Sequence, residues 1–181
     1  MIITITGKPG SGKSTIAKML AAHYHLKHYS AGDFMREIAK KRNMSLMQLT
    51  LLAEKGIEID KEIDMRTLEL AKKEKSFIID SRLAFHFVEN AIKVFLDVDE
   101  ETGAERIFKA MRADERENTS YDATLENIMR RERSECERFL RYYKIEIYDM
   151  ENYDIVVNTT KLGINEVFDA VKKEIKEKFR L

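Results

Sequence analysis

A glycine-rich turn near the N-terminus constrains this chain more than any other stretch. Residues 5–18 read ITGKPGSGKSTIAK and contain the pattern G-x-x-x-x-G-K-[ST], which runs from Gly7 to Ser14. The turn follows the apolar, β-branched run MIITIT and precedes apolar residues at helical spacing. Backbone N–H groups in such a turn surround an anion, and the following helix adds the positive end of its dipole. The pattern therefore predicts a nucleoside-triphosphate site, in preference to a glycine-rich turn with a solvated lysine.

The residues of this loop have expected partners on a bound triphosphate. Lys13 is expected to reach the β- and γ-phosphates as a point charge, and the hydroxyl of Ser14 to ligate Mg²⁺. A nucleoside triphosphate is the expected ligand and Mg²⁺ the expected cofactor. The residues expected to bind the triphosphate are Gly7, Lys8, Pro9, Gly10, Ser11, Gly12, Lys13, Ser14 and Thr15.

The rest of the chain alternates short apolar runs with helical patterns, which is typical of a parallel sheet covered by helices on both faces. We expect one domain over residues 1–181, with an α/β, three-layer P-loop NTPase fold and a five-stranded parallel sheet. The predicted strands are 1–6, 28–30, 76–80, 92–98 and 153–159. The predicted helices are 14–25, a helical stretch over 33–75 broken near Asn43 and Gly56, 100–111, 123–149 and 165–179. The helical stretch and a polar loop at 112–122 interrupt the alternation and are the expected moving parts.

Composition excludes several classes of protein. Thirty-two basic and 32 acidic residues give a net charge of zero, so no overall field favours nucleic acid or membrane as a partner. The single cysteine, Cys136, excludes an internal disulfide and any multi-cysteine metal site. No apolar run approaches the roughly 20 residues that span a bilayer, and the N-terminus lacks a signal-peptide pattern. We expect a soluble, cytoplasmic protein.

What receives the phosphate is a separate question. A GTPase switch requires an Asn-Lys-x-Asp base reader and an Asp-x-x-Gly turn, and neither NTTKLG (158–163) nor DSRL (80–83) supplies one. A motor ATPase is usually larger and has an obvious partner surface. A small-molecule kinase needs a second pocket facing the γ-phosphate, with cationic groups that close over the transfer. Three further stretches favour the kinase.

The first of these is YSAGDFMRE (29–37), which follows the second predicted strand. Ser30 and Gly32 place a small polar turn at the carboxyl end of a strand, where α/β sheets bind ligands. Arg36, one turn into the next helix, is positioned to bind a pair of phosphate oxygens. A structural interpretation stays open, in which Ser30 and Asp33 cap the helix and Arg36 is a surface residue.

The second stretch, FIIDSR (77–82), ends a buried strand in an acid and an arginine. Asp80 is placed to hold the Mg²⁺ shell, through water, as a Walker-B-type carboxylate. Arg82 then emerges beside the phosphates. The alternative is an ordinary ion pair at the end of a strand.

The third stretch, MRRERSECERFLR (129–141), is a helix dense in arginine. Arg131, Glu135 and Arg138 stand at positions i, i+4 and i+7, which places them on one helix face. Two guanidinium groups on one face suit a lid that neutralises charge on a phosphoryl group in transfer. The alternative is a solvated, salt-bridged helix, which we prefer for Arg130, Arg133 and Arg141.

Together these stretches resemble nucleoside monophosphate kinases. The S-x-G-D-x-x-R pattern at Ser30 to Arg36 is similar to the monophosphate-site motif of adenylate kinases. Over nearly the full length the sequence more closely resembles the short archaeal-type cytidylate kinases. The stretches that carry this closer resemblance are MSLMQLTLLAEKGIEIDKEID (44–64), RLA (82–84), SYDA (120–123) and YDIVVNT (153–159).

The resemblance implies transfer of the γ-phosphate of ATP to CMP or dCMP, with Mg²⁺. It implies a core of residues 1–30, 76–111 and 150–181, a monophosphate-binding segment over about 31–75, and a lid with its helix over about 112–149. Matched by position, Arg36 and Arg82 hold the acceptor phosphate in a pocket shaped by Ser30 and Gly32. Lys13, Arg131 and Arg138 are the catalytic cations, Ser14 and Asp80 hold the metal, and Arg106 lies over the adenine.

The resemblance supplies no residue that reads the base. Bacterial cytidylate kinases carry an aspartate for this purpose at the position that Leu83 occupies in this chain. His86, close by in the sequence, is expected to be structural or to line the pocket, because phosphoryl transfer depends mainly on positioning and electrostatics.

Two other functions remain open from the sequence alone. One is a related small kinase for an AMP-like or non-nucleotide acceptor. The other is an NTP-dependent RNA-binding switch, with the arginine-rich helix as its contact surface and a steep dependence on salt. We expect ATP and a nucleoside monophosphate as partners, no nucleic acid or membrane, and a monomer.

Overall fold

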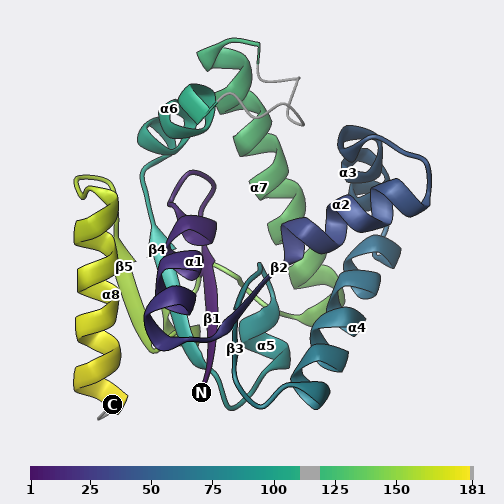
Figure 1. Cartoon of the computed structure of the whole chain (residues 1–181). Coiled ribbons are helices and arrows are strands. Elements are labelled where there is room, and N and C mark those ends of the chain that lie inside the picture. The colour runs from purple at the N-terminus through teal and green to yellow at the C-terminus, as the bar shows by residue number, and fades with distance from the viewer. Residues whose placement is uncertain (111–118, 180–181) are drawn as a thin grey trace.

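The sheet that the sequence predicts is present in the structure, a computed structural model that describes residues 1–110 and 119–179 (Figure 1). Five strands form one parallel sheet in the order β2-β3-β1-β4-β5. Their bounds are β1 (Ile2–Gly7), β2 (Lys27–Ser30), β3 (Phe77–Asp80), β4 (Ile92–Asp97) and β5 (Ile155–Asn158). The predicted α/β fold is confirmed.

Helices follow each strand, and three of them stand between β2 and β3. They are α1 (Lys13–Tyr24), α2 (Ala31–Lys41), α3 (Leu46–Lys55), α4 (Glu58–Lys73), α5 (Ala84–Phe87), α6 (Glu100–Ala110), α7 (Tyr121–Tyr143) and α8 (Ile164–Phe179), with a 3₁₀ turn η1 (Met150–Asn152). In the part of the chain that the structure describes, no helix is long and apolar enough to cross a membrane.

Helices cover both faces of the sheet, which makes three layers. On one face, α1 and α8 pack Ile16 and Val171 against Ile5 of β1. On the other face, Phe95 of β4 lies in a separate cluster with Phe139 of α7. Burial on both faces explains why the strands read as continuous apolar runs rather than as alternating patterns.

The register of the central strands assembles the predicted site. Ile5 of β1 is level with Asp80 of β3, and Asp80 is level with Ser30 of β2. Because the strands are parallel, their carboxyl ends meet at one edge of the sheet, where α/β proteins bind ligands. The phosphate loop, Ser30 and Asp80 therefore come together although they lie far apart in the sequence.

Helices α2, α3 and α4 form a unit with a small core of its own, beside the sheet (Figure 1). Ile38, Leu49 and Ile59, one from each helix, are almost completely buried there. The breaks between the helices fall where the sequence predicts them, at Asn43 with its left-handed backbone and at Gly56. That this unit binds the monophosphate stays a prediction.

Two details differ from the predicted elements. Helix α7 ends at Tyr143 rather than Asp149, because Lys144 adopts a left-handed backbone with φ 60° and Ile147 then returns to the core. Helix α5, a single turn, is absent from the prediction. Most of the polar loop predicted at 112–122 lies outside the described residues.

Candidate active site

The phosphate loop turns sharply between β1 and α1. Gly10 and Gly12 have φ values of 76° and 88°, in the left-handed region that favours glycine. A side chain at Gly10 would also collide with the backbone of Gly103 in α6. Helix α1 begins at Lys13, so its N-terminal N–H groups face the loop, as anion binding requires.

The loop opens onto a cavity of about 310 Å³ between the sheet edge, the α2–α4 unit and α7. The wall brings together most of the residues that the sequence singles out. Those on the wall are Pro9, Gly10, Gly12, Lys13, Ser14, Thr15, Ser30, Gly32, Arg36, Asp80, Arg82, Arg131 and Arg138. The predicted site residues that do not line it are Gly7, Lys8, Ser11 and Arg106.

Lys13 reaches back across its own loop. Its Nζ donates to the carbonyl oxygen of Lys8 at 2.7 Å. Burial, and after it the positive charge of Arg82, lowers the pKa of Lys13 well below its usual value. A cation held under such conditions is stabilised by an anion, so this site favours a phosphate group.

Asp80 is the centre of a polar cluster at the sheet edge. Its Oδ2 accepts from the hydroxyls of Ser14 at 2.7 Å and Ser30 at 3.1 Å, and its Oδ1 lies 2.5 Å from Nε2 of His28. Burial acts to raise the pKa of Asp80, but the hydrogen bonds from His28 and Ser14 outweigh it and hold that pKa below its usual value. An ionised carboxylate beside a serine hydroxyl offers the hard oxygen ligands that Mg²⁺ prefers.

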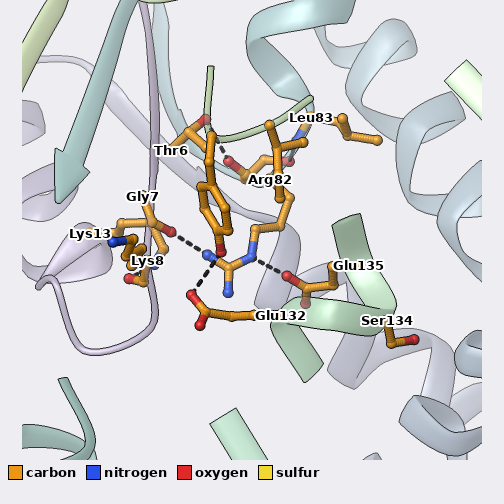
Figure 2. A network of polar contacts seen from close by, with 12 residues as sticks. Thr6, Gly7, Lys8, Lys13, Arg82, Leu83, Glu132, Ser134 and Glu135 are labelled. Carbon is orange, nitrogen blue, oxygen red and sulfur yellow. Dashed lines mark hydrogen bonds and ion pairs between the residues drawn. The ribbon is translucent and has the colours of Figure 1, made fainter. Parts of the chain in front are cut away.

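Arg82 links the phosphate loop to α7. Figure 2 shows its guanidinium between the carbonyl oxygen of Gly7 and the carboxylate of Glu135, and the distance from Nε to Oε2 of Glu135 is 2.7 Å. Burial alone would lower the pKa of Arg82, but Glu135 outweighs it and raises that pKa. Arg82 therefore carries a half-buried, fixed positive charge on the cavity wall.

The two arginines predicted for the lid lie on one face of α7 and line the cavity. Arg138 forms an ion pair with Asp60 of α4, with Nε 2.8 Å from Oδ2, and both side chains are only 12% exposed. Burial acts to raise the pKa of Glu135 between them, but Arg82, Arg131 and Arg138 outweigh it and lower that pKa. Asp60 thus holds Arg138 in place at the cavity, and the solvated-helix interpretation does not apply to Arg138. For Arg131, which lines the same cavity, a role in the lid stays a prediction.

The S-x-G-D-x-x-R stretch is consistent with both interpretations of its sequence, a helix cap with a surface arginine and a ligand-binding turn. Ser30 does cap α2, because its Oγ accepts from the backbone N–H of Gly32 at 3.2 Å. Arg36 does contact Asp33, at 2.6 Å between exposed side chains. Ser30, Gly32 and Arg36 nevertheless all line the cavity. Capping and ligand binding are therefore compatible at this turn.

The sequence analysis missed an acidic side of the cavity, formed by α3 and α4. Glu54, Asp60 and Asp64 line it, and each contacts α7. Glu54 pairs with Arg130 at 2.9 Å, and Oδ2 of Asp64 accepts from the hydroxyl of Tyr143 at 2.5 Å. The spacing of Asp60 and Asp64, four residues apart on a predicted helix, was a signal that both carboxylates share one face.

Two other predicted residues lie away from the cavity wall. Arg106 donates to backbone oxygens of the loop before α8, including that of Thr159 at 2.8 Å, so its position over adenine stays a prediction. His86 packs edge-on against Phe87, with ring centroids 4.8 Å apart, and does not line the cavity. The structural role expected for His86 agrees with this packing.

Comparisons with known proteins identify structures with the same fold as this chain and show the family to which it belongs. A crystal structure of an uncharacterised protein from Eubacterium ventriosum matches with a TM-score of 0.72 at 24% identity, over 98% of this chain and 99% of that one. A shikimate kinase from Bacteroides thetaiotaomicron matches with a TM-score of 0.67 at 17% identity, over 100% and 99%. At these identities the structures establish the P-loop kinase fold alone.

Sequence relatives are closer. A protein of Sulfurisphaera tokodaii named cytidylate kinase is 41% identical over 174 residues, which is 95% of this chain and 93% of the relative. One of Methanocaldococcus jannaschii with the same name is 40% identical over 180 residues, 97% of both chains. The profile of the cytidylate kinase-like family matches residues 2–161. This chain, a P-loop kinase by its fold and its relatives, belongs to the cytidylate kinase-like family.

Proposed function

We propose that this protein is a (d)CMP kinase, which transfers the γ-phosphate of ATP to CMP or dCMP and forms ADP and CDP or dCDP. The observation that carries the proposal is one cavity with a phosphate loop on one side and arginines from three other elements on the other. Those arginines are Arg36, Arg82, Arg131 and Arg138. Relatives named cytidylate kinase cover nearly the whole chain, which supports cytosine as the base.

The donor side of the cavity is the phosphate loop. Its N–H groups and Lys13 hold the β- and γ-phosphates, and the buried lysine regains a favourable charge environment when they bind. Arg106, which donates to Thr159 behind the loop, is proposed to contact the adenine. These contacts orient the γ-phosphate toward the centre of the cavity.

Ser14 and Asp80 fit a magnesium ion. The carboxylate is ionised, its oxygen lies 2.7 Å from the serine hydroxyl, and both residues line the cavity beside the phosphate loop. Ser14 and Asp80 would hold Mg²⁺ there, and the ion would supply positive charge that neutralises part of the charge of the ATP phosphates. His28 and Ser30 keep the Asp80 carboxylate oriented toward Ser14.

The acceptor side is formed by arginines. Arg82 and Arg36 hold the phosphate of the acceptor, while Ser30 and Gly32 shape the turn beside it. Arg131 and Arg138 then stabilise the charge that develops on the transferring group. We propose residues 31–75 as the acceptor-binding segment and 112–149 as the lid, whose closure excludes water and so prevents loss of phosphate by hydrolysis.

The proposal includes action as a monomer in the cytoplasm.

An acceptor panel tests the proposed function. We would measure ADP formation from ATP and Mg²⁺ with CMP, dCMP, UMP, AMP or GMP, against a reaction without acceptor. A large acceleration by CMP and dCMP alone is the expected result. Acceleration by AMP alone would keep the mechanism and refute the cytosine assignment, and no acceleration by any acceptor would refute the kinase proposal.

A further inference from the structure

Among the residues that the structure describes, five carboxylates line the cavity, and Asp64 differs from the other four. They are Glu54, Asp60, Asp64, Asp80 and Glu135. Four of them contact a basic side chain: the pairs are Glu54 with Arg130, Asp60 with Arg138, Asp80 with His28, and Glu135 with Arg82. Among the described residues, the partner of Asp64 is instead a neutral hydroxyl, that of Tyr143. The basic partners account for four of the acids, and Asp64 needs another explanation.

Asp64 is also buried, with 7% of the residue exposed. A buried carboxylate without a cation is costly, and proteins keep such groups mainly where a ligand uses them. Burial, together with the nearby charge of Asp60, raises the pKa of Asp64 to about 7. Burial also raises the pKa of the Tyr143 hydroxyl, so this group keeps its proton and donates to Oδ2. Tyr143 thereby fixes the carboxyl and engages only one of its two oxygens.

The surroundings of Asp64 suit a flat, mostly apolar ring. Ile63, Leu83 and Phe139 line the same cavity. Along α7, Phe139 lies eight residues beyond Arg131, or about 12 Å at 1.5 Å per residue. The cavity thus offers apolar side chains as well as arginines, which suits a molecule that carries both a base and a phosphate.

We propose that Asp64, held by Tyr143, is the residue that reads the acceptor base, by accepting a hydrogen bond from the 4-amino group of cytosine. Uracil carries an oxygen at that position, which offers no proton to a carboxylate and is repelled by its charge. This inference rests on the proposed function and adds to it the source of the preference for cytosine over uracil. The acid comes from α4, in the acceptor-binding segment.

Replacement of the carboxylate by an amide tests this role. In Asp64→Asn the amide oxygen can keep the Tyr143 hydrogen bond, while its NH₂ group faces the base and can donate to O4 of uracil. We expect kcat/KM for CMP to fall, kcat/KM for UMP to rise, and their ratio to change by at least about tenfold. A loss of packing would lower both values together. Asp169→Asn, at an exposed position of α8, is the matched control and should leave the ratio unchanged.

A modified substrate gives a second measurement, which can be made on the wild-type enzyme alone. The substrate is CMP with its 4-amino group replaced by hydrogen. The wild-type enzyme should use it at least about tenfold less efficiently than CMP, and Asp64→Asn should discriminate much less between the two. Tyr143→Phe, which keeps the ring and removes the hydroxyl, should weaken the discrimination of the wild type.

The outcomes separate this inference from the proposed function. If the wild type phosphorylates CMP and a folded Asp64→Asn variant keeps the wild-type CMP-to-UMP ratio, the inference is wrong and the proposed function stands. If Asp64→Asn does not fold, equal use by the wild type of CMP and the analogue with hydrogen in place of the 4-amino group overturns the inference. If the wild type phosphorylates no pyrimidine nucleotide, both fail.

Discussion

The two sides of the cavity are built in different ways. The donor side is continuous in the sequence, because nine residues from Gly7 to Thr15 form the loop and the start of α1. The acid-lined side is assembled from contacts between helices far apart in the sequence. Three side-chain contacts, here called its ties, join this side to α7. They link Glu54 with Arg130, Asp60 with Arg138 and Asp64 with Tyr143, at separations of 76, 78 and 79 residues.

This difference separates what each side does for the protein. The donor side places a buried lysine, whose charge is unfavourable there, in reach of a ligand. Between α4 and α7 the partners come from the protein itself: Arg138 neutralises Asp60, and the hydroxyl of Tyr143 donates to Asp64. We therefore expect changes on the donor side to affect activity, and changes in the ties to affect stability as well.

The largest effect is expected for Arg138→Met. The substitution leaves the buried carboxylate of Asp60 without its cation, which costs about 3 kcal/mol of unfolding free energy. Chemical denaturation measures this loss. The double variant Asp60→Asn/Arg138→Met should recover much of the stability without recovering activity. A single variant as stable as the wild type would show that this tie does not support the fold.

The next prediction concerns Lys13→Ala, which is expected to lower activity strongly without lowering stability. Removal of one contact to the transferring phosphate should lower kcat by at least about 10²-fold. The melting temperature should stay equal or rise, because the buried lysine has a lowered pKa and destabilises the fold. Wild-type turnover in this variant would refute its assignment, and a large fall in melting temperature would remove the contrast between the two sides.

A smaller effect concerns pH and Asp64. Its pKa of about 7 in the folded protein lies above the usual value of about 3.9, so between these values the folded state holds one more proton than the unfolded chain. Its contribution to stability is therefore greatest at low pH, falls by about 1.4 kcal/mol per pH unit as pH rises, and levels off above pH 7. Asp64→Asn should remove this slope, which thermal unfolding between pH 5 and 8 can measure. Parallel curves for the two proteins would contradict the prediction.

The smallest effect is expected at the exposed tie. Arg130 is 46% exposed where it meets Glu54, and exposed ion pairs contribute about 0–1 kcal/mol. Arg130→Met should therefore shift the melting temperature by less than about 4 °C. A loss of stability as large as that expected for Arg138→Met would show that the contacts with α7 stabilise the protein as one coupled network. Their contributions would then not follow the burial of each pair.

Most of the fold and the donor side could be predicted from the sequence. The phosphate loop is a local pattern whose backbone conformation follows from its glycines. Asp80 and Ser30 follow from the rule that parallel strands end at one edge of a sheet. The short turn α5 carries too few residues to show a helical period.

The acid-lined side could not be predicted, for physical reasons. The spacing of Asp60 and Asp64 places both on one face of α4, but only the packing of α4 against α7 decides that this face meets the cavity. The end of α7 was missed because Lys144 adopts a left-handed backbone without being glycine. Charged residues continue past it, with neither glycine nor proline before Asp149 to indicate the end.

The position of Arg82 has a geometric consequence for the whole site. One guanidinium joins the backbone of the phosphate loop to Glu135 of α7, through its NH1 and Nε groups. The guanidinium is rigid and planar, so the separation of its two hydrogen-bond acceptors follows from bond lengths and angles alone. The guanidinium thus fixes how far apart these two acceptor oxygens lie, and so sets the width of the contact that joins the loop to α7. A lysine, with a single ammonium on a flexible stem, could carry the same charge and would not keep that width.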